Sequence, residues 1–128
     1  MIVDTSALLA IVFQEQGWES VLDRIVSSPD VAAGTPTLAE TGIVLQARLG
    51  NDAAGMLERM LKELGIQEVP FGEAHWREAS DAFRRFGKGQ HAAGLNFGDC
   101  MTYAVARLAG EPLLHAGEDF GRTDVTLA

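Results

Sequence analysis

Short apolar runs alternate with amphipathic stretches along the whole chain. In the amphipathic stretches, apolar residues recur at intervals of three and four, which is the helical period. This period predicts helices over residues 7–13, 17–27, 36–49, 52–64, 73–86 and 99–108. The short runs predict strands over residues 1–4, 31–34, 66–69 and 112–115, and a last strand over 125–127. Strands separated by helices indicate an α/β sandwich with a short, mainly parallel sheet.

Local signals place two of the helix starts. Thr35 and Pro36 are typical of a capping residue followed by the first residue of a helix. Thr5 or Ser6 is expected to cap the helix that follows the first strand.

Several side chains are expected to pack in the core. The helix over 99–108 is apolar nearly all round, which predicts that it is buried together with its residues Cys100 and Tyr103. Aromatic residues at helical spacing elsewhere are interpreted as packing residues in the same way: Trp18, Trp76, Phe83 and Phe86.

Length and composition narrow the class of protein. A chain of 128 residues, 47% hydrophobic and 22% charged, is expected to fold as one globular domain over residues 1–128. The single Cys100 excludes an internal disulfide and favours a cytoplasmic location. The longest apolar run, residues 7–13, is too short to span a membrane and does not read as a signal peptide, so no membrane contact is expected. The net charge of −8 disfavours a protein that coats nucleic acid without specificity.

Acidic residues stand at predicted strand ends and helix starts. Asp4 ends the first strand, Glu40 lies in the first turns of a helix, and Asp99 starts the buried helix. Asp119 and Asp124 follow the fourth strand. Ligands of parallel sheets bind beyond the carboxyl ends of the strands. Folding is therefore expected to bring most of these acids together.

Carboxylates that converge in this way repel one another and raise their own pKa values. A hard divalent cation such as Mg²⁺ relieves the repulsion, because it prefers oxygen ligands and uses one or two carboxylates together with water. Such an ion also makes water a better nucleophile near neutral pH. The alternative interpretation is that each acid separately caps a helix or faces solvent.

Stretches spread over the whole sequence resemble one family. The opening MIVDTSAL, residues 1–8, resembles the start of PIN-domain nucleases, and GLNFGDCMTYA, residues 94–104, strongly resembles the same region of VapC toxins. Glu40 lies in the Leu-Ala-Glu context of the family's second acid. The tail fits the same group through Pro-Leu-Leu at 112–114, Asp-Phe at 119–120 and Thr-Asp-Val at 123–125. The block around Asp99 is the most specific of these stretches.

The resemblance implies a fold, an activity and partners. The implied fold is a three-layer α/β/α sandwich, and the implied activity is that of a Mg²⁺-dependent endoribonuclease, with Mn²⁺ as an alternative ion. Such a protein is the toxin of a toxin–antitoxin pair, forms homodimers and cleaves a structured RNA such as tRNA or rRNA. Its cognate antitoxin, of the VapB type, covers the toxin with a C-terminal segment and can place a basic side chain in the acidic pocket.

The resemblance also implies the site residues. Asp4 and Asp99 would bind the metal, with Glu40 completing the acidic cluster. Many PIN domains carry a fourth acid where this chain has Gly117, so the role passes to one of the acids that follow. Ser6 matches a polar position near the metal, and is equally expected as a helix cap. The two candidates for the fourth acid are Asp119 and Asp124.

A basic segment is the candidate RNA-binding surface. No acid lies between Asp81 and Asp99, and glycines there permit close approach of the backbone to a phosphate. The alternative is a solvated helix end, where cations are also favourable. If RNA is held elsewhere, Arg48 and Arg122 are the next candidates. The predicted RNA-binding residues are Arg84, Arg85, Lys88 and His91.

Other functions remain open beside the toxin. A housekeeping RNA-processing PIN nuclease would carry the same acids, and a catalytically inactive PIN-like binding module would fit the glycine at position 117. A phosphatase of the haloacid dehalogenase type is disfavoured, because Ser6 stands where that class needs a second Asp. A zinc site is disfavoured too, because the three His residues lack paired spacing and Cys100 is alone.

Overall fold

The computed structural model describes all residues from 1 to 128, and its centre is a four-stranded parallel sheet. The strand order is β3-β2-β1-β4, with β1 at Ile2–Val3, β2 at Val31–Gly34, β3 at Ile66–Val69 and β4 at Leu113–Leu114. All neighbouring strands are parallel. The predicted α/β architecture with a short parallel sheet is confirmed, and the carboxyl ends of all four strands lie at one edge.

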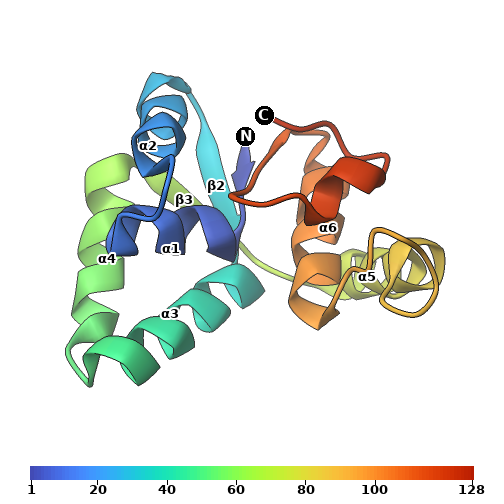
Figure 1. Cartoon of the computed structure of the whole chain (residues 1–128), viewed down its shortest axis with the longest axis horizontal. Helices are drawn as coiled ribbons and strands as arrows, with labels where there is room; N and C mark the ends of the chain where they lie inside the picture. Colours follow the sequence, from blue (N-terminus) through green and yellow to red (C-terminus); the bar gives the residue numbers. More distant parts are fainter.

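Helices cover both faces of the sheet, which gives three layers (Figure 1). On one side lie α1 (Thr5–Phe13), α2 (Trp18–Ser27), α3 (Thr35–Leu49) and α4 (Ala53–Leu64). On the other side lie α5 (Glu73–Phe86) and α6 (Phe97–Ala109), and the 3₁₀ helix η1 (Asp119–Arg122) follows β4. No helix is long and apolar enough to cross a membrane.

Each face of the sheet has its own apolar core, because successive strand residues point to opposite faces. Ile2 of β1 packs with Tyr103 and Val105 of α6, whereas Val3 packs with Leu8 of α1 and Ile25 of α2. The predicted burial of α6 is confirmed. The core on that side also holds Cys100, and burial followed by the charge of Asp99 raises the pKa of its thiol to about 11.

Three local predictions need correction. Asp4, rather than Thr5 or Ser6, caps α1, because its carboxylate accepts the backbone N–H of Ser6. Helix α6 begins two residues earlier than predicted, at Phe97, because the Asn96 side chain caps it. The last predicted strand is reduced to a single bridge between Leu113 and Leu127.

Two of the aromatic residues predicted to pack in the core are largely exposed. Trp76 is 53% exposed and Phe83 is 42% exposed, while Trp18 and Phe86 are partly buried. The helical period in α5 therefore continues on to a face that no other part of the chain covers. Together with Phe97, which is 80% exposed, Trp76 and Phe83 line an apolar groove between α5 and the start of α6.

Candidate functional site

Asp4 lies at the carboxyl end of β1, beneath the surface of the candidate site. Its side chain is 6% exposed and accepts hydrogen bonds on both oxygens. The Ser6 backbone N–H and hydroxyl donate to Oδ2 at 3.2 and 2.7 Å, and the Thr102 hydroxyl donates to Oδ1 at 2.9 Å. The Ser6 hydroxyl in turn accepts from the Ala116 N–H at 3.0 Å, so the loop after β4 is fastened to the same place. Ser6 therefore orients Asp4 and does not cap the helix itself.

Glu40 reaches the site from the second turn of α3. A Cβ atom at Gly98 would overlap with the Glu40 carboxylate, so this carboxylate lies directly against the first turn of α6. The amino end of a helix favours a negative charge. The absence of a side chain at Gly98 is what lets Glu40 approach the residue that follows, Asp99.

Asp99 occupies the third helical position of α6. Its carboxylate accepts the Asn96 N–H at 3.0 Å, while the Asn96 side chain accepts the Asp99 N–H at 2.9 Å. Burial raises the pKa of Asp99 to about 6, against the lowering effect of the Asn96 hydrogen bond. The negative charges of Asp4, Asp119 and Glu40 contribute to the same rise. The structure thus brings four of the predicted acids, from distant parts of the sequence, within electrostatic reach of one another.

The segment after β4 completes the site. Asp119, at the start of η1, is exposed and acts electrostatically on Asp99. His115 lies between β4 and η1 and packs edge-on against Phe120, with ring centroids 5.2 Å apart. Burial lowers the pKa of His115, and the charges of Asp4 and Asp119 oppose this shift. His115 therefore belongs to the site, although its isolated position in the sequence gave no signal.

The donor set suits a hard divalent cation in its chemistry. Carboxylate oxygens are the preferred ligands of Mg²⁺ and Mn²⁺. A cation would also relieve the like-charge crowding that helps to raise the pKa of Asp99. No group of three or more Asp, Glu, His or Cys side chains is arranged so that it could hold an ion. Asp4 and Asp99, whose carboxylates are oriented by hydrogen bonds, suit an ion that takes one or two carboxylates and fills its remaining positions with water.

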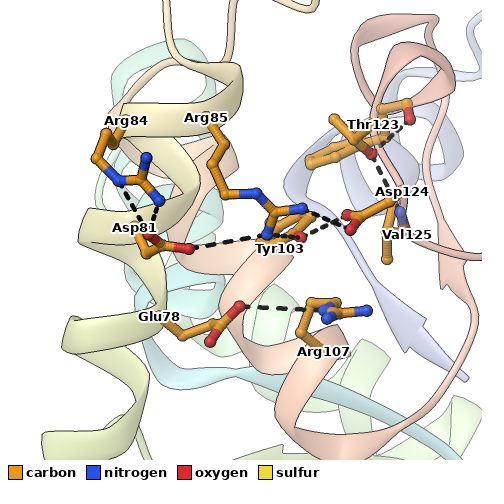
Figure 2. Close-up of polar contacts among 10 residues, drawn as sticks. Glu78, Asp81, Arg84, Arg85, Tyr103, Arg107, Thr123, Asp124 and Val125 are labelled. Carbon is orange, nitrogen blue, oxygen red and sulfur yellow. Dashed lines mark hydrogen bonds and ion pairs between the residues drawn. The ribbon is translucent and has the colours of Figure 1, made fainter.

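Asp124, the other candidate for the fourth acid, lies in a different network (Figure 2). Its carboxylate accepts the Tyr103 hydroxyl at 2.5 Å and the Arg85 guanidinium at 2.7 Å. These contacts, with the Tyr103 hydrogen bond first, lower the pKa of Asp124 against the effect of burial. Burial and then Asp124 raise the pKa of Tyr103 to about 12. Asp124 does not join the acids that act on Asp99.

The predicted RNA-binding residues lie around the end of α5 and the loop after it. Arg84 forms an ion pair with Asp81 at 2.6 Å, and Arg85 is held by Asp124 and more loosely by Asp81. Lys88 is exposed and forms no ion pair. His91 is also exposed, with its Nδ1 accepting the Ala93 N–H at 3.0 Å. Two of the three cations in this segment are therefore already neutralised within the chain.

The sequence matches a known family over nearly its whole length. Residues 1–125 match the PIN domain family, and the chain belongs to that family. It is 45% identical over 128 residues to ribonuclease VapC36 of Mycobacterium tuberculosis, covering 98% of this chain and 91% of that protein. It is also 39% identical over 125 residues to ribonuclease VapC of Mycolicibacterium smegmatis, covering 98% and 97%. Within the PIN domains, its relatives are thus the VapC ribonucleases.

Solved structures share the fold at lower identity. The crystal structure of Mycobacterium tuberculosis VapC20, a sarcin–ricin-loop-cleaving toxin, superposes with a TM-score of 0.80 at 20% identity, over 99% of this chain and 97% of that one. VapBC2 from Rickettsia felis, bound to a DNA fragment from its promoter, gives 0.78 at 11% identity, over 99% and 96%. Similarity at this level of identity establishes the three-layer fold.

Proposed function

We propose that this protein is a Mg²⁺-dependent endoribonuclease toxin that cleaves a structured RNA, with Mn²⁺ as an alternative ion. The observation that carries the proposal is the convergence of acids from distant elements: the Glu40 carboxylate lies against Gly98, next to Asp99, and Thr102 of the same helix donates to Asp4. Acids that only cap separate helices need not converge, whereas a cation site needs several carboxylates within reach of one ion. The relatives named as VapC ribonucleases support the same activity.

Each acid has a distinct task in the proposed site. Asp4 and Asp99 are the metal ligands, and Glu40 and Asp119 complete the negative cluster at its rim. When bound, the ion stabilises charge on the phosphate and lowers the pKa of water. The chain itself contributes orientation, because Ser6 and Asn96 hold the Asp4 and Asp99 carboxylates by hydrogen bonds.

RNA binding is proposed for the surface around Lys88 and His91, with Arg84 beside them. Arg84 and Lys88 are exposed, and the ion pair of Arg84 with Asp81 is of the surface kind, which contributes little to stability and can be exchanged for a phosphate. Arg85 was predicted for the same task. The contacts of Arg85 with Asp124 and Tyr103 support a structural role for this side chain, ahead of RNA binding.

The proposed partners are a cognate antitoxin of the VapB type and a second copy of the chain. Solved neighbours that are toxin–antitoxin complexes, such as the one from Klebsiella pneumoniae with a TM-score of 0.73, support the first. The apolar groove lined by Trp76, Phe83 and Phe97 supports the second, because monomers rarely expose such a surface. Analytical ultracentrifugation of wild type and Phe83→Ser would test for the dimer. We expect the Phe83→Ser variant to dimerise more weakly than wild type.

Sequencing of RNA 5′ ends after brief expression in cells tests the proposed function. We expect new ends at one or a few positions in a structured RNA with wild type, and none with Asp4→Asn. Co-expression of the proposed cognate antitoxin should suppress the new ends. A housekeeping processing enzyme would instead produce mature ends without arresting growth, and an inactive binding module would produce none.

A further inference from the structure

The Asp4 side chain is also contacted from α6, which packs on the opposite face of the sheet from α1, the helix that Asp4 caps. Thr102 is 2% exposed, and its hydroxyl lies 2.9 Å from Asp4 Oδ1. Because a carboxylate only accepts, the Thr102 hydroxyl must be the donor. This buried hydrogen bond joins residues 98 positions apart in the sequence.

A second threonine stands behind the first. The Thr37 hydroxyl lies 3.1 Å from the Thr102 hydroxyl, and Thr37 is also buried. A hydroxyl has one hydrogen, and that of Thr102 is given to Asp4. Thr37 must therefore donate to Thr102. The two hydrogen bonds then run in one direction, from Thr37 to Thr102 and from Thr102 to the Asp4 carboxylate. No buried polar side-chain atom in the structure lacks a partner.

The two threonines occupy positions that are related to the acids. Thr102 follows Asp99 by three residues on α6, and Thr37 precedes Glu40 by three residues on α3. Residues three apart share one face of a helix. The chain of hydroxyls therefore links β1, α6 and α3, the three elements that carry Asp4, Asp99 and Glu40, in a buried layer beneath the acids.

We propose that Thr102, supported by Thr37, is a positioning residue that fixes the Asp4 carboxylate for metal binding; this inference rests on the proposed function of the site. Groups that hydrogen-bond to a metal ligand orient it, and their loss costs 10–100-fold in metal affinity or activity in proteins generally. Valine has the shape of threonine without the hydroxyl. Thr102→Val would leave Asp4 Oδ1 and the Thr37 hydroxyl without their partner, while the packing of α6 is retained.

The test compares Mg²⁺ affinity, measured by calorimetry on the full chain without RNA, with kcat and KM for RNA cleavage. Thr102→Val should weaken Mg²⁺ binding by about tenfold and lower kcat, with KM for RNA changed by less than about twofold. Thr102→Ser, which keeps the hydroxyl, should bind Mg²⁺ within about twofold of wild type. Thr41→Val is the matched control: Thr41 is fully buried on α3, but its hydroxyl donates to the Thr37 carbonyl at 2.8 Å and not toward Asp4.

The outcomes separate this inference from the function on which it rests. If wild type binds Mg²⁺, Asp4→Asn does not, and Thr102→Val binds like wild type, the positioning role is overturned and the proposed function stands. If Thr41→Val weakens Mg²⁺ binding as much as Thr102→Val, the effect is general destabilisation and the inference is also overturned. If wild type neither binds Mg²⁺ nor cleaves RNA, both fail.

Thr37→Val keeps the test decisive if Thr102→Val does not fold. It removes only the Thr37 hydroxyl and keeps the Thr102 hydrogen bond to Asp4, so we expect Mg²⁺ affinity to fall by less than in Thr102→Val. A Thr37→Val affinity equal to that of wild type would then contradict the inference.

Discussion

The Asp124 carboxylate accepts a hydrogen bond from the Arg85 guanidinium at 2.7 Å, and this ion pair ties the end of the chain to α5 (Figure 2). The two residues were predicted for different tasks, one as a candidate fourth acid and the other as an RNA contact. Their pairing gives both a structural use. It leaves Asp119 as the acid after β4 that acts on Asp99.

This pairing predicts that Asp124→Asn lowers stability and leaves metal binding unchanged. Loss of the ion pair and weakening of the Tyr103 hydrogen bond should cost about 1 kcal/mol of unfolding free energy, because the carboxylate is partly exposed. The pKa of Asp124 is lowered in the folded state, so its contribution is present above its ordinary pKa and disappears as the pH falls through the lowered value. Urea unfolding at neutral pH and calorimetry with Mg²⁺ measure the two effects. Asp119→Asn should show the reverse pattern, and an Mg²⁺ affinity lost in Asp124→Asn would contradict the assignment.

The raised pKa of Asp99 leads us to expect that stability falls as the pH rises. Its pKa is raised from 3.8 to about 6, so the unfolded chain ionises first as the pH rises. The metal-free protein should therefore lose stability between about pH 4 and 6, and the loss should persist above that range. Asp99→Asn removes this loss, so at pH 7 it should be more stable than wild type by up to about 1 kcal/mol after solvent screening, yet inactive. Thermal unfolding in EDTA from pH 4 to 8 measures both curves. Parallel curves of stability against pH for the two proteins would show that ionisation of Asp99 does not destabilise the fold.

We expect Gly98→Ala to lower RNA cleavage without lowering the stability of the fold. The added Cβ would overlap with the Glu40 carboxylate, which is the end of a flexible side chain and can turn away. Alanine also favours a helix over glycine by about 0.5–1 kcal/mol. Thermal unfolding should therefore be unchanged or slightly improved, whereas RNA cleavage should fall at least as far as in Glu40→Gln. Full activity in Gly98→Ala would show that cleavage does not need Glu40 at this position.

The basic segment predicts a salt-dependent effect on RNA binding. Arg84→Glu with Lys88→Glu should weaken RNA affinity most at low salt, and the slope of log K against log salt should flatten by about 0.7–0.9 for each phosphate that the variant no longer neutralises. The control is Arg59→Glu with Lys62→Glu, an equal charge change on exposed residues of α4 in the opposite layer. Arg85 is left intact because its ion pair with Asp124 supports the fold. Equal weakening of RNA affinity in both double variants would show that total charge, rather than this segment, governs binding.

Much of the fold follows from local patterns, because hydrophobic period and helix caps act over a few residues. The positions of Asp4 and Asp99 could be predicted, since strand ends and helix starts of a parallel sheet converge at one edge. The Arg85–Asp124 pair and the Thr102 hydrogen bond could not, because they join residues 39 and 98 positions apart. Trp76 was placed in the core wrongly, because an apolar helix face has the same spacing whether or not the chain covers it.

Cleavage of a purified structured RNA, with and without divalent ions, tests the central claim most directly. We expect cleavage with Mg²⁺ or Mn²⁺, complete loss in EDTA, and recovery when Mg²⁺ is added in excess. Asp4→Asn and Asp99→Asn, prepared in the same way, should be folded and inactive throughout. Undiminished cleavage in EDTA, or cleavage at the wild-type rate by either Asn variant, would contradict a metal-dependent site built from these acids.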